Sequence, residues 1–241
     1  KEKKKFLKSK FKKCIVITNN QLKKYKYNIS IVIHTASLND KDSNKSKNSL
    51  KKNLDITIKL FKDLNTKNLK KIIYLSSAQV YGSSLIGKVK EEKNLFPKNN
   101  YGKSRYLNEI FLKRYSELFK KNLIILRISN VVGVPAIYNR SCLRLLPNDI
   151  KNQSELNGEL NLRSSGLQYR NFISMKFLTQ TILKLKKKRT EGILIFNLGS
   201  INTKIINFVK EFAKNYKIKK NKILKINILS NLPKTTKKLS Y

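Results

Sequence analysis

Short apolar runs alternate with longer amphipathic stretches along most of the 241-residue chain. The main apolar runs predict buried strands at 14–18, 29–36, 70–75, 123–128 and 193–197. The stretches between them carry apolar residues at helical spacing, which predicts helices over 48–66, 99–120, 143–153, 175–187 and 202–216. Strands that alternate with helices are typical of an α/β protein with a parallel sheet.

The helix predicted over 99–120 carries signals for its start and for its buried side. Asn99 or Asn100 can cap its first turn, because a short polar side chain accepts hydrogen bonds from the free backbone N–H groups there. Four apolar residues at helical spacing are expected to face the core: Leu107, Ile110, Phe111 and Leu118. Asn202 is expected to cap the helix predicted over 202–216 in the same way. Beyond residue 133 the alternation loosens, and short strands are predicted at 159–162, 169–173 and 223–228.

The charge of the chain is strongly positive, with 54 Lys and Arg residues against 14 Asp and Glu residues and a formal net charge of +40. Of the basic residues, 46 are lysines and only 8 are arginines, and the lysines are spread through every segment. Proteins that read bases or hold phosphates usually use arginine for bidentate contacts. We therefore interpret the lysines as a solvated surface and expect no specific nucleic-acid partner, although nonspecific affinity for polyanions follows from the charge.

The rare residues exclude several further classes of protein. His34 is the only histidine, so neither a histidine-based metal site nor a serine–histidine–aspartate triad with a spare histidine is supported. Cys14 and Cys142 stand far apart without a CxxC motif, which favours a reducing compartment, and we expect a cytoplasmic protein. No run of 18 apolar residues predicts a membrane span. The first glycine is Gly82, so residues 1–81 contain no glycine-rich phosphate loop.

Polar residues stand at the ends of several predicted strands, where open parallel sheets bind their ligands. These strand ends are His34-Thr35-Ala36-Ser37, Ser76-Ser77-Ala78 and Ser129-Asn130. Tyr101 and Arg105 lie one turn apart on the same face of the helix predicted over 99–120. A guanidinium beside a phenol favours the phenolate form, which makes a tyrosine a usable acid/base group near neutral pH. Ser76 or Ser77 could share the proton.

An ordered set of motifs runs from about residue 15 to residue 241. The motifs are IVIHTAS (31–37), Asn53 with Thr57, IIYLSSAQVYG (72–82), NYGKSRYLNE (100–109), LRISNVVG (126–133), YRNFI (169–173) and IFNLGS (195–200). This set resembles the extended short-chain dehydrogenases/reductases, and within them the NAD-dependent nucleotide-sugar epimerase/dehydratase family. The pair formed by SSxxVYG and YGKSxxxNE at this separation is the most specific part of the resemblance.

The resemblance implies a fold, a reaction and a set of catalytic residues. Ser77 matches the family's catalytic serine or threonine, and Tyr101 matches its acid/base tyrosine. Arg105 stands where the family has a lysine that binds the nicotinamide ribose and supports the tyrosine. In the family's reaction the tyrosinate removes a proton from a sugar hydroxyl while a hydride passes to NAD or NADP, which gives a transient keto sugar.

The resemblance also implies which residues bind cofactor and substrate. The expected cofactor-binding residues are His34, Thr35, Ala36, Asn53, Ser76 and Arg105. The expected residues for a nucleotide-sugar substrate are Ser77, Asn130 and Arg170, and an arginine fork suits the diphosphate physically. No metal site, nucleic-acid partner or membrane partner is expected, and pairing into a homodimer is common in the family.

The sequence departs from the family's pattern in three places. Arg105 keeps the charge of the family's lysine but is bulkier and never releases its proton. Lys176 and Phe177 stand where relatives often have acidic residues. The family opens with a βαβ unit carrying GxxGxxG, whereas only 13 glycine-free residues precede the strand predicted at 14–18. We therefore expect a Rossmann-like parallel sheet flanked by helices and lacking the first βαβ unit, in a chain clipped at both ends.

Two regions follow from this interpretation, an incomplete NAD-binding domain at 1–133 and a smaller, partly interleaved α/β substrate-binding region at 134–241. Ala78 and Gln79 follow Ser77, where sugar 4,6-dehydratases typically have Asp and Glu as acid and base for water elimination. The sequence thus favours an epimerase or a keto-sugar reductase. A catalytically inactive relative or fragment of the same fold is the alternative, and a basic polyanion-binding protein is disfavoured because no nucleic-acid module is recognisable.

Overall fold

The computed structural model describes residues 19–22, 29–46, 48–64, 66–82, 87–135, 142–229 and 239–240. The strand predicted at 14–18 and its Cys14 lie outside the described residues. Within the described part, no helix is long and apolar enough to cross a lipid bilayer.

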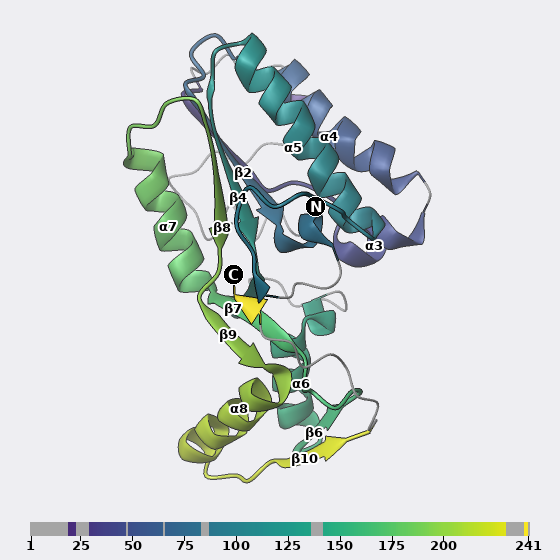
Figure 1. Ribbon diagram of the computed structural model, residues 1–241. Helices are drawn as coiled ribbons and strands as arrows, with labels where there is room; N and C mark the ends of the chain where they lie inside the picture. The colour runs from purple at the N-terminus through teal and green to yellow at the C-terminus, as the bar shows by residue number, and fades with distance from the viewer. Residues whose placement is uncertain are drawn as a thin grey trace.

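A four-stranded parallel sheet forms the centre of the larger lobe (Figure 1). Its strands are, in spatial order, β1 (Ile31–His34), β2 (Lys71–Ser77), β4 (Asn122–Ile128) and β8 (Ile193–Leu198). The runs of Ile, Val and Leu in these strands suit a sheet that is covered on both faces. The parallel α/β sheet predicted from the sequence is confirmed.

Helices cover both faces of this sheet. On one face α4 (Ser49–Asp63) and α5 (Asn100–Leu118) pack over a cluster that includes Phe61, Leu69, Ile72, Tyr74 and Leu112. On the other face α7 (Met175–Lys187) packs over a cluster that includes Ile73, Ile124, Leu126, Ile173 and Leu178. Alternate residues of β2 therefore feed the two cores, as the period of a strand requires.

The smaller lobe lies beside the carboxyl end of the main sheet (Figure 1). It contains a three-stranded sheet of β5 (Asn130–Val132), β7 (Tyr169–Ser174) and β9 (Ile201–Lys204), and a parallel pair of β6 (Glu159–Leu162) and β10 (Lys225–Ile228). Helices α6 (Leu146–Leu156) and α8 (Ile205–Lys220) pack on this pair through Ile150, Leu160, Val209 and Leu224. Since β8 lies between β7 and β9 in the chain, the two lobes are interleaved.

The remaining described elements are short. They are α2 (Asn19–Leu22), α3 (Asp40–Lys45), η1 (Ala78–Tyr81), β3 (Gly87–Lys88), η2 (Cys142–Arg144) and β11 (Leu239–Ser240).

Two predictions about helices were wrong in detail. Asn202 does not cap α8, because it lies inside β9, and the capping position is Lys204. The buried side of α5 is also different from the predicted one: Leu118 is 77% exposed. The fully buried positions of α5 include the polar residues Ser104, Asn108 and Glu109. This helix turns a polar face toward the sheet because a buried ion pair and the site described below lie there.

Candidate active site

Ser77 is the last residue of β2 and begins the turn that follows it. The residue is buried, and its Oγ accepts a hydrogen bond of 3.2 Å from the backbone N–H of Gln79, which caps η1. The hydroxyl proton is not used by that bond. Ser77 therefore stands at the carboxyl edge of the central sheet, with a proton that it can donate to a ligand.

The turn after Ser77 is locked onto the first turn of α5, where Tyr101 lies. Asn99 caps α5 by accepting a hydrogen bond of 2.7 Å from the N–H of Gly102, and its Nδ2 donates to Oε1 of Gln79 at 2.8 Å. A Cβ on Gly102 would stand 2.5 Å from the carbonyl oxygen of Gln79, so only glycine permits this approach. The backbone thus brings the Ser77 strand end and the Tyr101 helix turn together, as the sequence predicted.

Tyr101 and Arg105 form a direct pair. Nη2 of Arg105 donates to the Tyr101 hydroxyl at 3.1 Å, and the guanidinium carbon lies 4.9 Å from the centre of the phenol ring. Nη1 of Arg105 donates to the carbonyl oxygen of Leu75 at 3.1 Å, which anchors the side chain to β2. Arg105 is only 8% exposed, whereas Tyr101 is half-buried and open to a ligand.

Arg105 keeps its positive charge at this buried position. Burial disfavours the charged form, but the phenol oxygens of Tyr101 and Tyr74 outweigh that effect and raise the pKa of Arg105 above its ordinary value. A fixed cation whose N–H points at the Tyr101 oxygen stabilises negative charge on that oxygen. The pair can therefore support proton transfer through the phenol.

The segment after β1 reaches the Tyr101 turn through α3, which contacts α5. Thr35 and Ala36 are exposed at the strand end, and α3 follows them. Oδ1 of Asn44, on α3, accepts a long hydrogen bond of 3.4 Å from the Tyr101 N–H. The strand-end residues predicted to contact a cofactor therefore lie on a segment that continues directly to the Tyr101 turn.

His34 and Asn53 lie behind that segment rather than on its surface. His34 is 1% exposed, and its Nε2 is 2.9 Å from Oγ1 of Thr57. Burial, with a contribution from the charge of Arg105, lowers the pKa of His34 to about 4, so the ring is neutral at neutral pH. Asn53 is fully buried, accepts from the N–H of Leu38 at 2.7 Å and donates to Oγ of Ser43 at 3.1 Å. Both side chains hold the segment in place.

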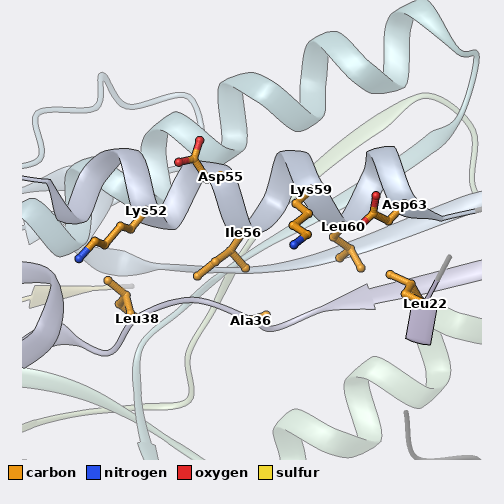
Figure 2. A pocket seen from close by; sticks show the side chains of 9 residues that line it. All are labelled: Leu22, Ala36, Leu38, Lys52, Asp55, Ile56, Lys59, Leu60 and Asp63. Atoms are coloured by element: carbon orange, nitrogen blue, oxygen red, sulfur yellow. The ribbon is translucent and has the colours of Figure 1, made fainter. Parts of the chain in front are cut away.

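A groove lies along the same segment, between it and α4 (Figure 2). Its volume is about 400 Å³. Figure 2 shows Ala36 and Leu38 facing Ile56 and Leu60 of α4. Charged side chains of α4 border this apolar floor: Lys52, Asp55, Lys59 and Asp63. The groove therefore offers an apolar surface with a charged border next to the strand end.

Ser76 points away from Ser77, as adjacent residues of a strand must. Its Oγ donates to Oε1 of Glu109 at 2.5 Å, inside the core under α5. The other two predicted binding residues lie on the smaller lobe. Asn130, at the start of β5, donates from Nδ2 to the carbonyl oxygen of Asn171 at 2.8 Å, and Arg170 on the neighbouring strand β7 is exposed.

The buried ion pair of Glu109 and Arg127 was not predicted from the sequence. Nη2 of Arg127 lies 2.9 Å from Oε2 of Glu109, and both side chains are at most 2% exposed. Nη1 of Arg127 also donates to the Tyr81 hydroxyl at 2.7 Å and to the carbonyl oxygen of Glu91 at 2.9 Å. The pair joins α5, β4, η1 and the loop after β3. Glu109 and Arg127 stand in the motifs NYGKSRYLNE and LRISNVVG. The sequence signal that could have revealed the pair is Arg127, a charged residue inside an otherwise apolar strand.

A parallel α/β sheet with a serine turn and a tyrosine–cation pair at its carboxyl edge defines a Rossmann-like protein of the extended short-chain dehydrogenase/reductase class. The chain belongs to the NAD dependent epimerase/dehydratase family, whose model matches residues 1–199.

Among curated proteins, the chain is similar to the human dTDP-D-glucose 4,6-dehydratase, with 32% identity over 144 residues. That match covers 59% of this chain and 39% of the human protein, so it spans about two fifths of the relative's length. The Dictyostelium discoideum dTDP-D-glucose 4,6-dehydratase is 29% identical over 189 residues, which cover 73% of this chain and 42% of that protein.

Solved structures share the fold at lower identity. The UDP-glucose 4-epimerase from Brucella ovis in complex with NAD has a TM-score of 0.74 at 18% identity, over 92% of this chain and 72% of the other. The UDP-N-acetylglucosamine 4-epimerase from Methanobrevibacter ruminantium M1 in complex with UDP-N-acetylmuramic acid has a TM-score of 0.70 at 24% identity, over 90% and 68%. These likenesses confirm the predicted fold class.

Proposed function

We propose that this chain carries the catalytic part of an NAD- or NADP-dependent epimerase or reductase that acts on a nucleotide-diphosphate sugar through a transient keto sugar. The observation that carries this proposal is the hydrogen bond of 3.1 Å from the buried Arg105 to the Tyr101 hydroxyl, next to the turn that begins at Ser77. Family membership and the solved relatives with NAD or a nucleotide sugar support it.

Tyr101 is the acid/base residue in this proposal. As a phenolate it takes the proton from a sugar hydroxyl, and as a phenol it returns that proton to the sugar oxygen. Arg105 stabilises the phenolate through the hydrogen bond from Nη2. Ser77 donates its hydroxyl proton to the same sugar oxygen and holds it in place. NAD, when bound, supplies the acceptor and donor of the hydride that leaves the sugar carbon.

The residues of this chain fit one end of the cofactor. Tyr101 and Arg105 offer a hydroxyl and N–H donors to a ribose, and the exposed Thr35 and Ala36 offer a strand-end surface beside them. We propose that His34 and Asn53 act by holding this surface, since their hydrogen bonds go to Thr57, Leu38 and Ser43. Ser76 acts in the same indirect way through Glu109.

The substrate side belongs to the smaller lobe in this proposal. Arg170 is an exposed cation on β7 that can pair with a diphosphate, and Asn130 lies at the start of the neighbouring strand β5. Nδ2 of Asn130 is bonded to the Asn171 carbonyl oxygen, so its Oδ1 is the atom left for a ligand.

The curated relatives are 4,6-dehydratases, but the turn after Ser77 does not suit water elimination. Elimination needs one group that protonates the leaving hydroxyl and one that removes a neighbouring C–H proton. The two residues at that place are Ala78, which has no titratable group, and Gln79, whose Oε1 accepts from Asn99 at 2.8 Å. We therefore favour epimerisation or reduction, with the C6 hydroxyl retained.

The test is to incubate the protein with NAD or NADP and a panel of UDP- and dTDP-sugars, and in a second series with NADH or NADPH and the matching keto sugars, and to follow the sugar by NMR. The expected product is an epimer or a reduced sugar that keeps its C6 hydroxyl. A 4-keto-6-deoxy sugar would contradict the argument from Ala78 and Gln79. A matched Tyr101→Phe variant is expected to give no product above the background.

A catalytically inactive relative is the second candidate, and Arg105 in the place of the family's lysine is the observation that favours it. Fluorescence titration with NADH and with a UDP-sugar separates the two candidates. Binding of both with turnover supports the enzyme. Binding of neither, or binding without turnover for every sugar of the panel, supports the inactive relative.

A further inference from the structure

Four buried polar atoms without a hydrogen-bond partner among the described residues belong to Arg105 and its neighbours Tyr74 and Asn108. They are the Tyr74 hydroxyl, Nε of Arg105, and Nδ2 and Oδ1 of Asn108. Tyr74 and Asn108 are fully buried, and Arg105 is 8% exposed. Buried polar groups are almost always paired, so four orphan atoms in one place point to a site where they satisfy one another, directly or through one buried water.

The three side chains face one another in the core under α5. The Tyr74 hydroxyl interacts with both the Arg105 guanidinium and the Asn108 amide. Tyr74 and Leu75 are neighbours on β2, and the Leu75 carbonyl oxygen already accepts from Nη1 of Arg105 at 3.1 Å. The same short piece of strand therefore offers the guanidinium a backbone acceptor and a phenol acceptor.

The ring of Tyr74 is itself held in place. It stacks on His34, with ring centres 5.4 Å apart and an angle of 27° between the rings. His34 is anchored by its contact of 2.9 Å with Thr57. Because the ring of His34 is neutral at neutral pH, it does not repel the Arg105 cation. The stack thus fixes where the Tyr74 hydroxyl can lie.

Arginine and lysine differ in what such a site must provide. A guanidinium has five N–H donors in a rigid plane, whereas an ammonium has three donors at the end of a flexible stem. In Arg105, Nη1 and Nη2 are used by Leu75 and Tyr101, and Nε is the buried donor that is left over, while the Tyr74 hydroxyl is close enough to act on the guanidinium. Acceptors on Tyr74 and Asn108 can bind this extra N–H group only when residue 105 is an arginine, since a lysine has no such group.

We propose that Tyr74 and Asn108 are positioning residues that hold the plane of the Arg105 guanidinium against the Tyr101 hydroxyl. The effect that substitutions of Tyr74 and Asn108 have on turnover rests on the proposed function, whereas their effect on Arg105 itself does not. Tyr74→Phe keeps the stack on His34 and removes only the hydroxyl that Arg105 requires.

The first test observes Arg105 without substrate or cofactor. The chain has 8 arginines, and the Nε–H signal of Arg105 in a nitrogen-15 NMR spectrum is assigned by its loss in Arg105→Lys. We expect Tyr74→Phe to speed the exchange of this proton with water at least ~10-fold, since the buried acceptor is gone. Asn108→Ala is expected to act in the same direction, and it replaces Tyr74→Phe if that variant does not fold.

Tyr115→Phe is the matched control, because its ring lies in the same aromatic cluster and its hydroxyl is not among the groups that act on Arg105. We expect no change of the Arg105 signal in this variant. An unchanged Arg105 exchange rate in both Tyr74→Phe and Asn108→Ala would overturn the proposal, whether or not the protein is an active enzyme.

The second test is a double-mutant cycle on turnover. Tyr74→Phe is expected to lower kcat ~10- to 100-fold with KM almost unchanged, because a misplaced cation affects the acid/base step rather than substrate binding. In the Arg105→Lys background the same substitution is expected to have little effect, since the lysine does not use the hydroxyl. Equal losses in both backgrounds would contradict a role through Arg105. An absence of turnover in every variant, with Arg105 exchange altered as expected, would count against the proposed function alone.

Discussion

His34 shows how one residue can combine a structural role with a clear pH signature. It is the only histidine of the chain, it is 1% exposed, and its pKa is lowered to about 4 by burial and by the charge of Arg105. In the unfolded chain its pKa is about 6.5. Between these values the unfolded state binds more protons than the native state, so stability falls as the pH falls.

We therefore predict that the free energy of unfolding decreases by about 2 kcal/mol between pH 7 and pH 5 because of His34. Urea unfolding at a series of pH values measures this slope. In His34→Asn the slope over the same window is expected to be much smaller, since no other histidine is present. Equal slopes in the two proteins would show that His34 is not buried as a neutral ring.

Arg105 carries the second prediction at this scale. Arg105→Lys restores the residue that the family's pattern has at this position, so turnover is expected to persist or to rise. Arg105→Met removes the cation beside Tyr101 and is expected to lower kcat by about 100-fold. Steady-state kinetics with the best sugar of the panel compares the two. A methionine variant as active as Arg105→Lys would exclude a role for the charge.

At the scale of elements, the buried pair of Glu109 and Arg127 joins α5 to β4. Removing one partner leaves the other charge buried and uncompensated, which costs about 3–5 kcal/mol. Glu109→Gln is thus expected to lower the free energy of unfolding by roughly that amount, measured by denaturant unfolding. Lys151→Gln, which breaks the exposed pair with Glu155, is the control and is expected to change stability by less than about 0.5 kcal/mol. A similar small effect for both variants would contradict the structural role of the buried pair.

The end of α7 depends on a lysine from the sheet. Nζ of Lys71 is buried and donates to the carbonyl oxygens of Leu185 at 3.0 Å and Lys186 at 3.3 Å, and also to that of Lys188. An ammonium at a helix C-terminus stabilises the unpaired carbonyl groups there. Lys71→Met is expected to lower the free energy of unfolding by about 1–3 kcal/mol. The adjacent exposed Lys70→Met is the control, and equal losses would argue against this cap.

The elements also show what the sequence could predict and what it could not. The approximate bounds predicted for α7 and β6 agree with the structure, because the spacing of apolar residues is a local signal. The buried face of α5 was predicted only in part: Phe111 packs on the core but Leu118 is exposed, and Glu109 is buried through its contacts with Ser76 on β2 and Arg127 on β4. Likewise, Tyr101 and Arg105 share a helix face and were predicted as a pair, whereas the approach of Tyr74 to Arg105 depends on how α5 packs on β2.

At the scale of the whole molecule, the net charge of +40 gives the lysine-rich surface a long-range attraction for any polyanion. The candidate site, by contrast, depends on the half-buried Tyr101 and on three buried residues: Arg105, Tyr74 and Ser77. The surface charge is screened by salt within about 10 Å at 0.1 M, while the buried contacts are much less sensitive.

The central claim is that Tyr101 serves as the acid/base residue for oxidation of a sugar hydroxyl by a bound nicotinamide cofactor. The most direct measurement is the absorbance of reduced nicotinamide after a single mixing of the NAD-loaded protein with its nucleotide sugar. We predict a transient signal of NADH in the native protein and its loss, with binding of NAD and sugar retained, in Tyr101→Phe. Formation of NADH at an equal rate in Tyr101→Phe, or no NADH from the native protein with both ligands bound, would contradict the claim.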